Sequence, residues 1–285
     1  LNQPNCNGAT PAFIAAQRGN ADVIKALHDC GANLNQPNRN GATPAFIAAA
    51  YGQAGAIIAL HAGGADLNQP NLGGATPAFI AAQKNHSGVI TALHLCKADL
   101  NQPNPNGATP AFIAAQQGNA NVITILHKYE ANLNQPTLSG ATPTYVAAQN
   151  GQTEAIMALH LCGADLTSPI GPNDNIVMTP ICIAAIRNKS AIIDYFIQIN
   201  SPSVLNYISI APSTLRGFYE APDFPLTDEL KRRLELKITE RISAGDSEEI
   251  IRLLPIDIAW FMGHDAMVAR LQIHALASRS TMPER

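Results

Sequence analysis

Five histidines recur at one fixed interval along the chain, and imidazole is the side chain best suited to bind a metal ion or carry a proton near neutral pH. They are His28, His61, His94, His127 and His160. If each one occupies the same place in a stack of helices, neighbouring rings lie roughly 8–10 Å apart. Zinc ligands, in contrast, converge to about 2.0–2.1 Å from one ion. We therefore interpret the histidines as a structural column, and we expect no metal and no cofactor.

The five cysteines do not form an arrangement that predicts thiol chemistry. Cys30, Cys96 and Cys162 share one phase of the same interval, so they are too far apart for disulfide bonds, and the sequence contains no CxxC pair. Cys182 lies in an apolar segment without a flanking base, a GxSxG elbow or a phosphate-binding loop. The thiols indicate a reducing compartment, and we do not expect an enzyme.

A strictly periodic sequence repeat positions all of these side chains. The tetrapeptide Leu-Asn-Gln-Pro begins at residues 1, 34, 67, 100 and 133, and a variant, Leu-Thr-Ser-Pro, begins at residue 166. In the first copy, Asn-Gly at residues 7–8 indicates a tight turn, and Thr10-Pro11 indicates a helix start with threonine as N-cap. Short helices are expected over residues 12–17 and about 21–30. One such pair cannot bury its own apolar face, so the copies are expected to stack.

The repeated framework is G-x-T-P-x-x-x-A-A-x-x-G, then an aliphatic helix, then G-A-D/N-x-N, and it resembles the ankyrin repeat. The resemblance covers residues 1–165 in five nearly regular units. It implies an all-α repeat solenoid of ankyrin-type helix-turn-helix units with extended, hairpin-like turns. Where the family usually has T-P-L-H, these units have Ala-Phe, or Thr-Tyr in the fifth, after Thr-Pro. An aromatic ladder is therefore expected in place of a polar histidine.

The pattern changes after residue 165. Thr179-Pro180 follows Thr142-Pro143 at a longer interval than separates the earlier Thr-Pro pairs, which predicts a sixth, lengthened repeat over residues 166–200. Prolines and aromatics over residues 201–226 predict an irregular insert with at most one short helix near 204–208. Residues 227–285 are interpreted as a divergent, charged helical region that closes the stack. Its first helix begins at Thr227, a second covers residues 248–254, and a degenerate terminal ankyrin-like repeat lies at about 254–275.

Two sets of positions differ between the repeats while the framework does not. They are the pair before the turn glycine and the end of the first helix. Packing constrains the framework, so the variable positions are candidates for recognition, although neutral drift on a solvated surface is the alternative. The family resemblance implies binding through the concave face made by the turns and first helices. The candidate protein-binding residues are Asn7, Arg18, Arg39, Asn40, Tyr51, Leu72, Lys84, Gln117, Leu138 and Asn150.

Composition argues against several other partners. The formal net charge is −3, and the basic residues at 231–241 alternate with acids, which is typical of a solvated helix and not of a nucleic-acid interface. No stretch approaches the roughly 18 apolar residues of a membrane span. The first residues also lack the charged-then-apolar pattern of a signal peptide. We expect a cytoplasmic monomer whose partner is another protein.

These observations favour a scaffold for protein–protein interaction. Regular repeats joined to a divergent C-terminal part also resemble ankyrin-containing effectors that intracellular bacteria deliver into host cells, which implies a virulence function in the host cytosol. Two alternatives remain open. The repeats could be the targeting arm of an enzyme whose catalytic part lies outside this chain, or residues 201–253 could contain an unrecognised site.

The resemblance also implies one modification. Ankyrin-like proteins are substrates of an asparaginyl hydroxylase in animal cells, whose targets have an aliphatic residue before the asparagine and a leucine eight positions upstream. The matching candidates are Asn35, Asn68, Asn101 and Asn134. Asn68 and Asn101 match more closely because an aspartate lies two positions before each. The alternative is that these side chains only hydrogen-bond the turn.

Overall fold

The structure is a computed structural model that describes residues 1–168 and 179–199, the strands at 208–210 and 251–253, and residues 232, 233, 236, 238–240, 243, 244, 257, 264, 266 and 268. The chain divides into two compact units. The first comprises Leu1–Leu138 with Met157–Ala164, and the second comprises Ser139–Ile156 with Asp165–Arg285.

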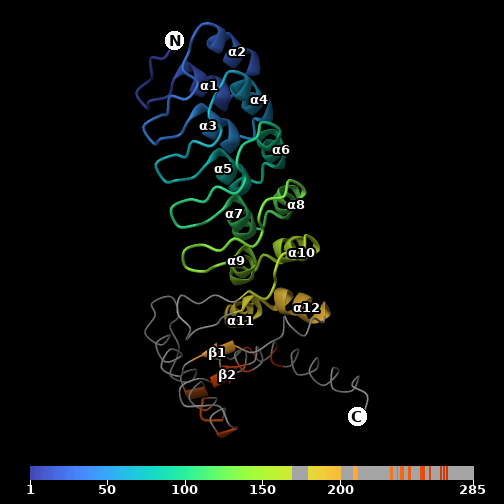
Figure 1. Ribbon diagram of the computed structural model, residues 1–285. Coiled ribbons are helices and arrows are strands. Elements are labelled where there is room, and N and C mark those ends of the chain that lie inside the picture. The colour runs from blue at the N-terminus through green and yellow to red at the C-terminus, as the bar shows by residue number, and fades with distance from the viewer. Residues whose placement is uncertain are drawn as a thin grey trace. The chain divides into compact units, whose positions relative to one another are not determined.

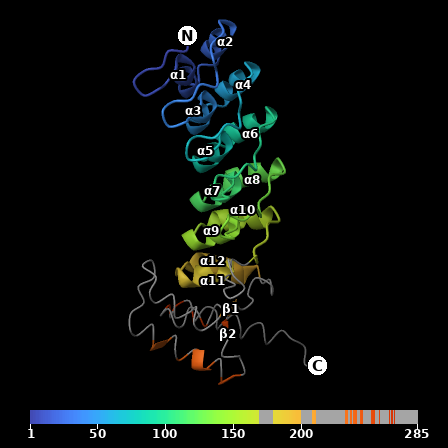
Figure 2. The same ribbon diagram turned by 60° about the vertical axis from the view of Figure 1, so that its left-hand side comes forward.

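The first unit contains four helix pairs stacked in two layers. The first helices pack α1 on α3, α3 on α5 and α5 on α7, and the second helices pack α2 on α4, α4 on α6 and α6 on α8 (Figure 1). Figure 2 shows the two layers side by side along the stack. This arrangement confirms the predicted all-α repeat solenoid. The helices are α1 (Pro11–Gln17), α2 (Ala21–Asp29), α3 (Pro44–Ala50), α4 (Ala54–Ala62), α5 (Pro77–Gln83), α6 (Ser87–Leu95), α7 (Pro110–Gln117) and α8 (Ala120–Lys128).

Each first helix begins as the sequence predicts. Proline takes the first position, and the threonine before it is the N-cap. In α5, for example, Oγ1 of Thr76 accepts a hydrogen bond from the backbone N–H of Phe79 at 3.1 Å. The Ala-Ala pairs that follow are buried in every copy, because neighbouring first helices approach closely there.

Asparagine side chains make the turns rigid. In each of the first four repeats, Oδ1 of the asparagine three residues before the turn glycine accepts two backbone N–H groups within the same turn, at 2.9–3.0 Å. These residues are Asn5, Asn38, Asn71 and Asn104. The turn glycine itself has a positive φ, +75° at Gly41. The turn therefore holds its shape by Asx hydrogen bonds.

The aromatic ladder expected after Thr-Pro is also observed. Phe13 and Phe46 pack together with Ala9 and Ala42 in one buried cluster beneath the first two turns. Phe79 and Tyr145 are buried at the same place in their repeats, and Phe112 is half-buried. Apolar contact thus supports the turns where the family usually has a histidine.

The second unit continues the same local pattern. It contains α9 (Pro143–Asn150), α11 (Pro180–Ile186) and α12 (Ser190–Gln198), and α11 packs against both α9 and α12. Helix α10 (Thr153–Leu161) crosses the boundary between the units. The helix pair predicted after the insertion is therefore present, and Phe196 is its largest fully buried side chain. The lengthened loop at 170–178 lies outside the described residues.

Two strands correct the prediction for the C-terminal part. Strand β1 (Ile208–Ile210) pairs antiparallel with β2 (Ile251–Leu253), and Ile208 lies opposite Leu253. The sequence predicts a helix over 248–254, whereas residues 251–253 form a strand, and of the helix predicted near 204–208 only Ile208 is described, as the first residue of β1. Both segments alternate an apolar residue with a polar one, and isoleucine favours extended backbone, so the short apolar runs fit a strand as well as a helix. The rest of the 201–226 insert lies outside the described residues.

Single residues further along support two predicted helices. Residues 238–240 are helical, and Ile238 is buried whereas Leu236 is exposed. His264 donates a hydrogen bond from Nε2 to the carbonyl of Ile186 at 3.3 Å. His86, which follows its own Thr-Pro proline at the same spacing as His264 follows Pro255, makes the same bond to Ala50 at 3.2 Å. The terminal ankyrin-like repeat at about 254–275 stays a prediction, because most of its residues lie outside the described part of the chain.

Candidate protein-recognition surface

All ten candidate binding residues are exposed. Asn7, Arg39, Asn40, Leu72 and Leu138 lie at the tips of the turns. Arg18, Tyr51 and Lys84 are the C-cap residues of α1, α3 and α5, and Gln117 is the last residue of α7. Asn150 is the last residue of α9 and belongs to the second unit. The turns and first helices of residues 1–138 are called the recognition face below.

Backbone hydrogen bonds join the tips of successive turns. The N–H of Arg39 donates to the carbonyl of Asn7 at 3.4 Å, and the N–H of Leu72 donates to that of Asn40 at 3.2 Å. Leu138 donates to Asn106 in the same way at 3.0 Å, whereas Pro105 has no N–H to donate. The side chains of Leu72 and Leu138 project from this edge and are 80% and 82% exposed. Two large apolar side chains are thus exposed on turns whose backbone is held by hydrogen bonds.

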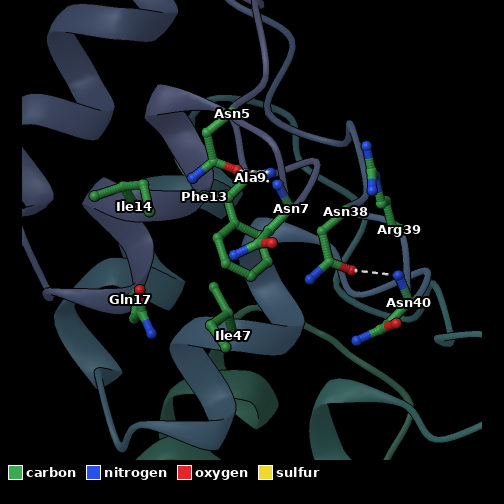
Figure 3. A pocket seen from close by; sticks show the side chains of 10 residues that line it. All are labelled: Asn5, Asn7, Ala9, Phe13, Ile14, Gln17, Asn38, Arg39, Asn40 and Ile47. Atoms are coloured by element: carbon green, nitrogen blue, oxygen red, sulfur yellow. Dashed lines mark hydrogen bonds between the residues drawn. The ribbon is translucent and has the colours of Figure 1, made fainter.

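A cavity of about 400 Å³ lies between the first two turns and their first helices (Figure 3). Its apolar floor is formed by Phe13, Ile14 and Ile47. Its rim carries the carboxamides of four asparagines and of Gln17, with Arg39 at one edge. The lining residues are Asn5, Asn7, Ala9, Phe13, Ile14, Gln17, Asn38, Arg39, Asn40 and Ile47. The structure therefore brings together three of the predicted residues, Asn7, Arg39 and Asn40.

A second row follows the ends of the first helices. Arg18, Tyr51 and Lys84 occupy the same position in three successive repeats, so the row alternates cation, aromatic ring and cation. The Tyr51 side chain is 55% exposed. Arg18 lines a separate cavity of about 520 Å³ in the first repeat, together with Pro11 and Val23. Val23 is 46% exposed there, whereas Val89 at the same position of the third repeat is fully buried.

Charge is segregated between the faces of the repeats. Residues 1–20, 34–53, 67–86, 100–119 and 133–152, which hold the turns and first helices, contain no aspartate or glutamate and three cations, Arg18, Arg39 and Lys84. Every acidic residue of 1–165 lies in a second helix or in the loop after it. Within the part of the chain that the structure describes, the three cationic side chains have neither a hydrogen bond nor an ion pair. The turns and first helices therefore carry a positive charge that no acidic residue of the same segments neutralises.

The histidine column lies on the second helices. His28, His61, His94 and His127 are exposed, and His160 is half-buried. The ring of His94 stacks on Tyr129 of the next repeat, with centroids 3.9 Å apart and planes 12° from parallel. Among the described residues, no three histidine, cysteine or acidic side chains come together as around a metal ion. This one ring contact joins two neighbouring repeats, and the structural role of the whole column stays an interpretation.

The cysteine thiols are free. Cys182 takes the place of the ladder aromatic in α11 and is fully buried, and Oγ1 of Thr179 donates to its Sγ at 3.1 Å. Burial raises the pKa of the Cys182 thiol to about 12. A thiol with this pKa stays protonated at neutral pH and is not a nucleophile.

Sequence reasoning missed the residues that do not vary. Asn5 and Asn38 line the cavity, yet the same residue recurs in the third and fourth repeats, so neither belongs to the variable positions. The signal that could have identified them is the asparagine that recurs three residues before the turn glycine in the first four repeats, because its Oδ1 can accept turn N–H groups while its NH₂ group remains to donate.

The candidate hydroxylation sites link neighbouring repeats. Oδ1 of Asn35, Asn68 and Asn101 accepts the backbone N–H of a residue 31 positions later, at 2.7–2.8 Å. The backbone N–H of Asn68 donates in turn to Asp66, and that of Asn101 donates to Asp99. These bonds give the asparagines the structural role considered above, and a hydroxylase must open the turn locally to reach them.

Hydroxylation of Asn68 and Asn101 stays a prediction. In protein recovered from animal cells with an active asparaginyl hydroxylase, mass spectrometry should show a gain of one oxygen on peptides that contain either residue. Protein from cells without the enzyme is the control. Unmodified peptides in the presence of the active enzyme would leave both asparagines with the structural role alone.

Comparison with known proteins agrees with this geometry. No curated protein matches the chain significantly. None of the helices in the described part of the chain has the length and apolar character needed to cross a membrane. The family model for ankyrin repeats (3 copies) matches residues 1–71 and 78–170, more than half of the sequence. The stacked helix pairs with hydrogen-bonded turns are therefore ankyrin repeats, and the chain belongs to the ankyrin repeat family.

Proposed function

We propose that the chain is a scaffold that binds a protein partner through the recognition face. Ankyrin repeats generally mediate protein–protein interaction. The observation that carries the proposal for this face is the cavity between the first two turns, where an apolar floor lies together with carboxamide groups and with Arg39, whose side chain has no hydrogen bond or ion pair among the described residues.

The exposed anchors have the chemistry of an interface. Tyrosine and arginine are enriched among residues that contribute most to binding, and leucines that are 80% exposed or more offer apolar area to a partner. These side chains stand on turns joined by backbone hydrogen bonds, so little ordering is needed when the partner binds. Exposure alone is also what neutral drift on a solvated surface would produce. Exposure together with a positive charge confined to this face and a cavity favours recognition of a partner.

Charge reversal on this face tests the function. The variant Arg18→Glu/Arg39→Glu/Lys84→Glu, and separately Tyr51→Ala, should lose a protein that the unchanged chain captures from cell lysate. Losing an anchor costs about 2 kcal/mol or more, which corresponds to an affinity about thirtyfold lower. Quantitative mass spectrometry of the captured proteins measures the loss, and thermal melts establish that the variants remain folded.

The chain offers a matched control. Lys25→Glu/Lys97→Glu/Lys128→Glu changes the net charge by the same amount on second helices and the loops after them. If the Arg18, Arg39 and Lys84 variant captured as much partner as the control variant and the unchanged chain, binding at the recognition face would be contradicted. Residues 166–285 would then be the candidate site. A function as an effector in a host cell is a finer proposal. It predicts that the captured partner is a host protein and not one from the cell that makes the chain.

A further inference from the structure

We propose that the partner presents an acidic, extended segment to the recognition face, with an apolar side chain in the cavity and carboxylates at Arg18, Arg39 and Lys84. This inference rests on the proposed function and names the chemistry of the partner. Three features of the face support it: its charge, its amide groups and the spacing of its cations.

The positive charge of the recognition face favours a negatively charged partner. The turns and first helices contain three exposed cations and no acid, so no carboxylate of this face competes for them. A positive face attracts a negative partner and speeds encounter, and like charges exclude basic segments. The acids of the repeats lie in the second helices and the loops after them.

The side-chain amides around the cavity favour a partner segment with an extended backbone. Oδ1 of Asn5 and of Asn38 is fully used by the turn, but the NH₂ group of each remains to donate. Asn40 and Gln17 make no side-chain hydrogen bond among the described residues, so each can both donate and accept. Such groups match the alternating N–H and C=O of an extended peptide. The apolar floor of Phe13, Ile14 and Ile47 then takes one side chain of that peptide (Figure 3).

The cations at the ends of the first helices determine the expected spacing of acidic residues in the partner. Arg18 and Lys84 are equivalent residues two repeats apart, with Tyr51 between them. Packed helices are about 8–10 Å apart, so these two cations are separated by roughly 16–20 Å. An extended chain advances by about 3.3–3.6 Å per residue. Acids about five or six residues apart can therefore reach both cations, with an apolar or aromatic residue between them at Tyr51.

Nucleic acid fits the face less well. Phosphate backbones are bound by dense arrays of lysine and arginine, and each neutralised phosphate needs its own cation. Three cations over several repeats do not supply that density, whereas they suit a few carboxylates along a peptide.

Peptide display tests the proposal on the full chain. The library holds random peptides of about 12 residues, because roughly 40 Å of extended chain spans both cations with room at each end. It is selected on the immobilised chain, with the Lys25, Lys97 and Lys128 charge-reversal variant as a control for net charge. We expect the selected peptides to contain at least about twice the aspartate and glutamate of the unselected library, with acids at the spacing derived above. Synthetic copies should bind about tenfold more weakly to the Arg18, Arg39 and Lys84 variant and less than twofold more weakly to the control.

The outcomes separate this inference from the proposed function. Peptides that lose affinity for the Arg18, Arg39 and Lys84 variant but are not enriched in acids would overturn the acidic segment and leave the recognition face in place. Peptides that bind this variant and the unchanged chain equally would overturn both. Failure to select any peptide counts against the acidic segment. Tighter binding of a single-stranded oligonucleotide, lost in the same variant, would assign the face to nucleic acid.

Discussion

Replacing Leu93 by alanine is expected to lower the free energy of unfolding by about 2–5 kcal/mol, the usual cost of emptying a fully buried leucine site. The Leu93 side chain has no exposed surface and lies in α6, which packs against both α4 and α8. In a stack stabilised by contacts between neighbours, a cavity in a central repeat weakens two interfaces at once. Urea unfolding monitored by circular dichroism measures the change.

Leu95 provides the control on the same helix. It lies two residues further along α6, and its side chain is 68% exposed. Leu95→Ala should change the free energy of unfolding by no more than about 0.5 kcal/mol, as is usual for surface substitutions. If the two variants lost the same stability, the packing assigned to α6 would be wrong.

The repeat framework could be predicted because its causes are local or periodic. Thr-Pro determines a helix start through a cap and a fixed φ, and apolar residues such as Ile57 and Leu60 recur on one helix face. Repetition then supplies the tertiary arrangement, since each copy packs on a copy of itself. The same reasoning succeeded for α11 and α12 after the lengthened loop.

The parts that could not be predicted depend on non-local partners. The segment around Ile251 forms a strand because it pairs with Ile208–Ile210, which is distant in the sequence, and a short apolar run does not reveal that pairing. The cavity likewise needs two turns and two helices in register. Asn38 could be identified from sequence as a turn residue, but its place beside Phe13 and Ile14 of the first repeat follows only from the stacking.

Replacing Gly41 by alanine is expected to destabilise the stack by about 2–5 kcal/mol and to displace the turn tips that carry Arg39 and Leu72. Gly41 has φ +75°, a region that costs an L-residue about 1–2 kcal/mol. An added Cβ would also lie 2.6 Å from the backbone nitrogen of Leu72, and the collision adds about 1–3 kcal/mol. Because the neighbour is backbone, relief requires moving the next turn, which breaks the bond from Leu72 to Asn40.

Gly64→Ala separates the two causes. Gly64 has nearly the same φ, +74°, but an added Cβ there would have no atom within 4 Å. Gly64→Ala should therefore lower the free energy of unfolding only by the cost of a positive φ, about 1–2 kcal/mol, and should leave capture of the partner unchanged. Urea unfolding of both variants measures the difference, and the capture assay on the folded Gly41 variant reports whether the turn tips have moved. Equal destabilisation would show that the turns are not in the close contact described here, and the case for a rigid recognition face would fail with it.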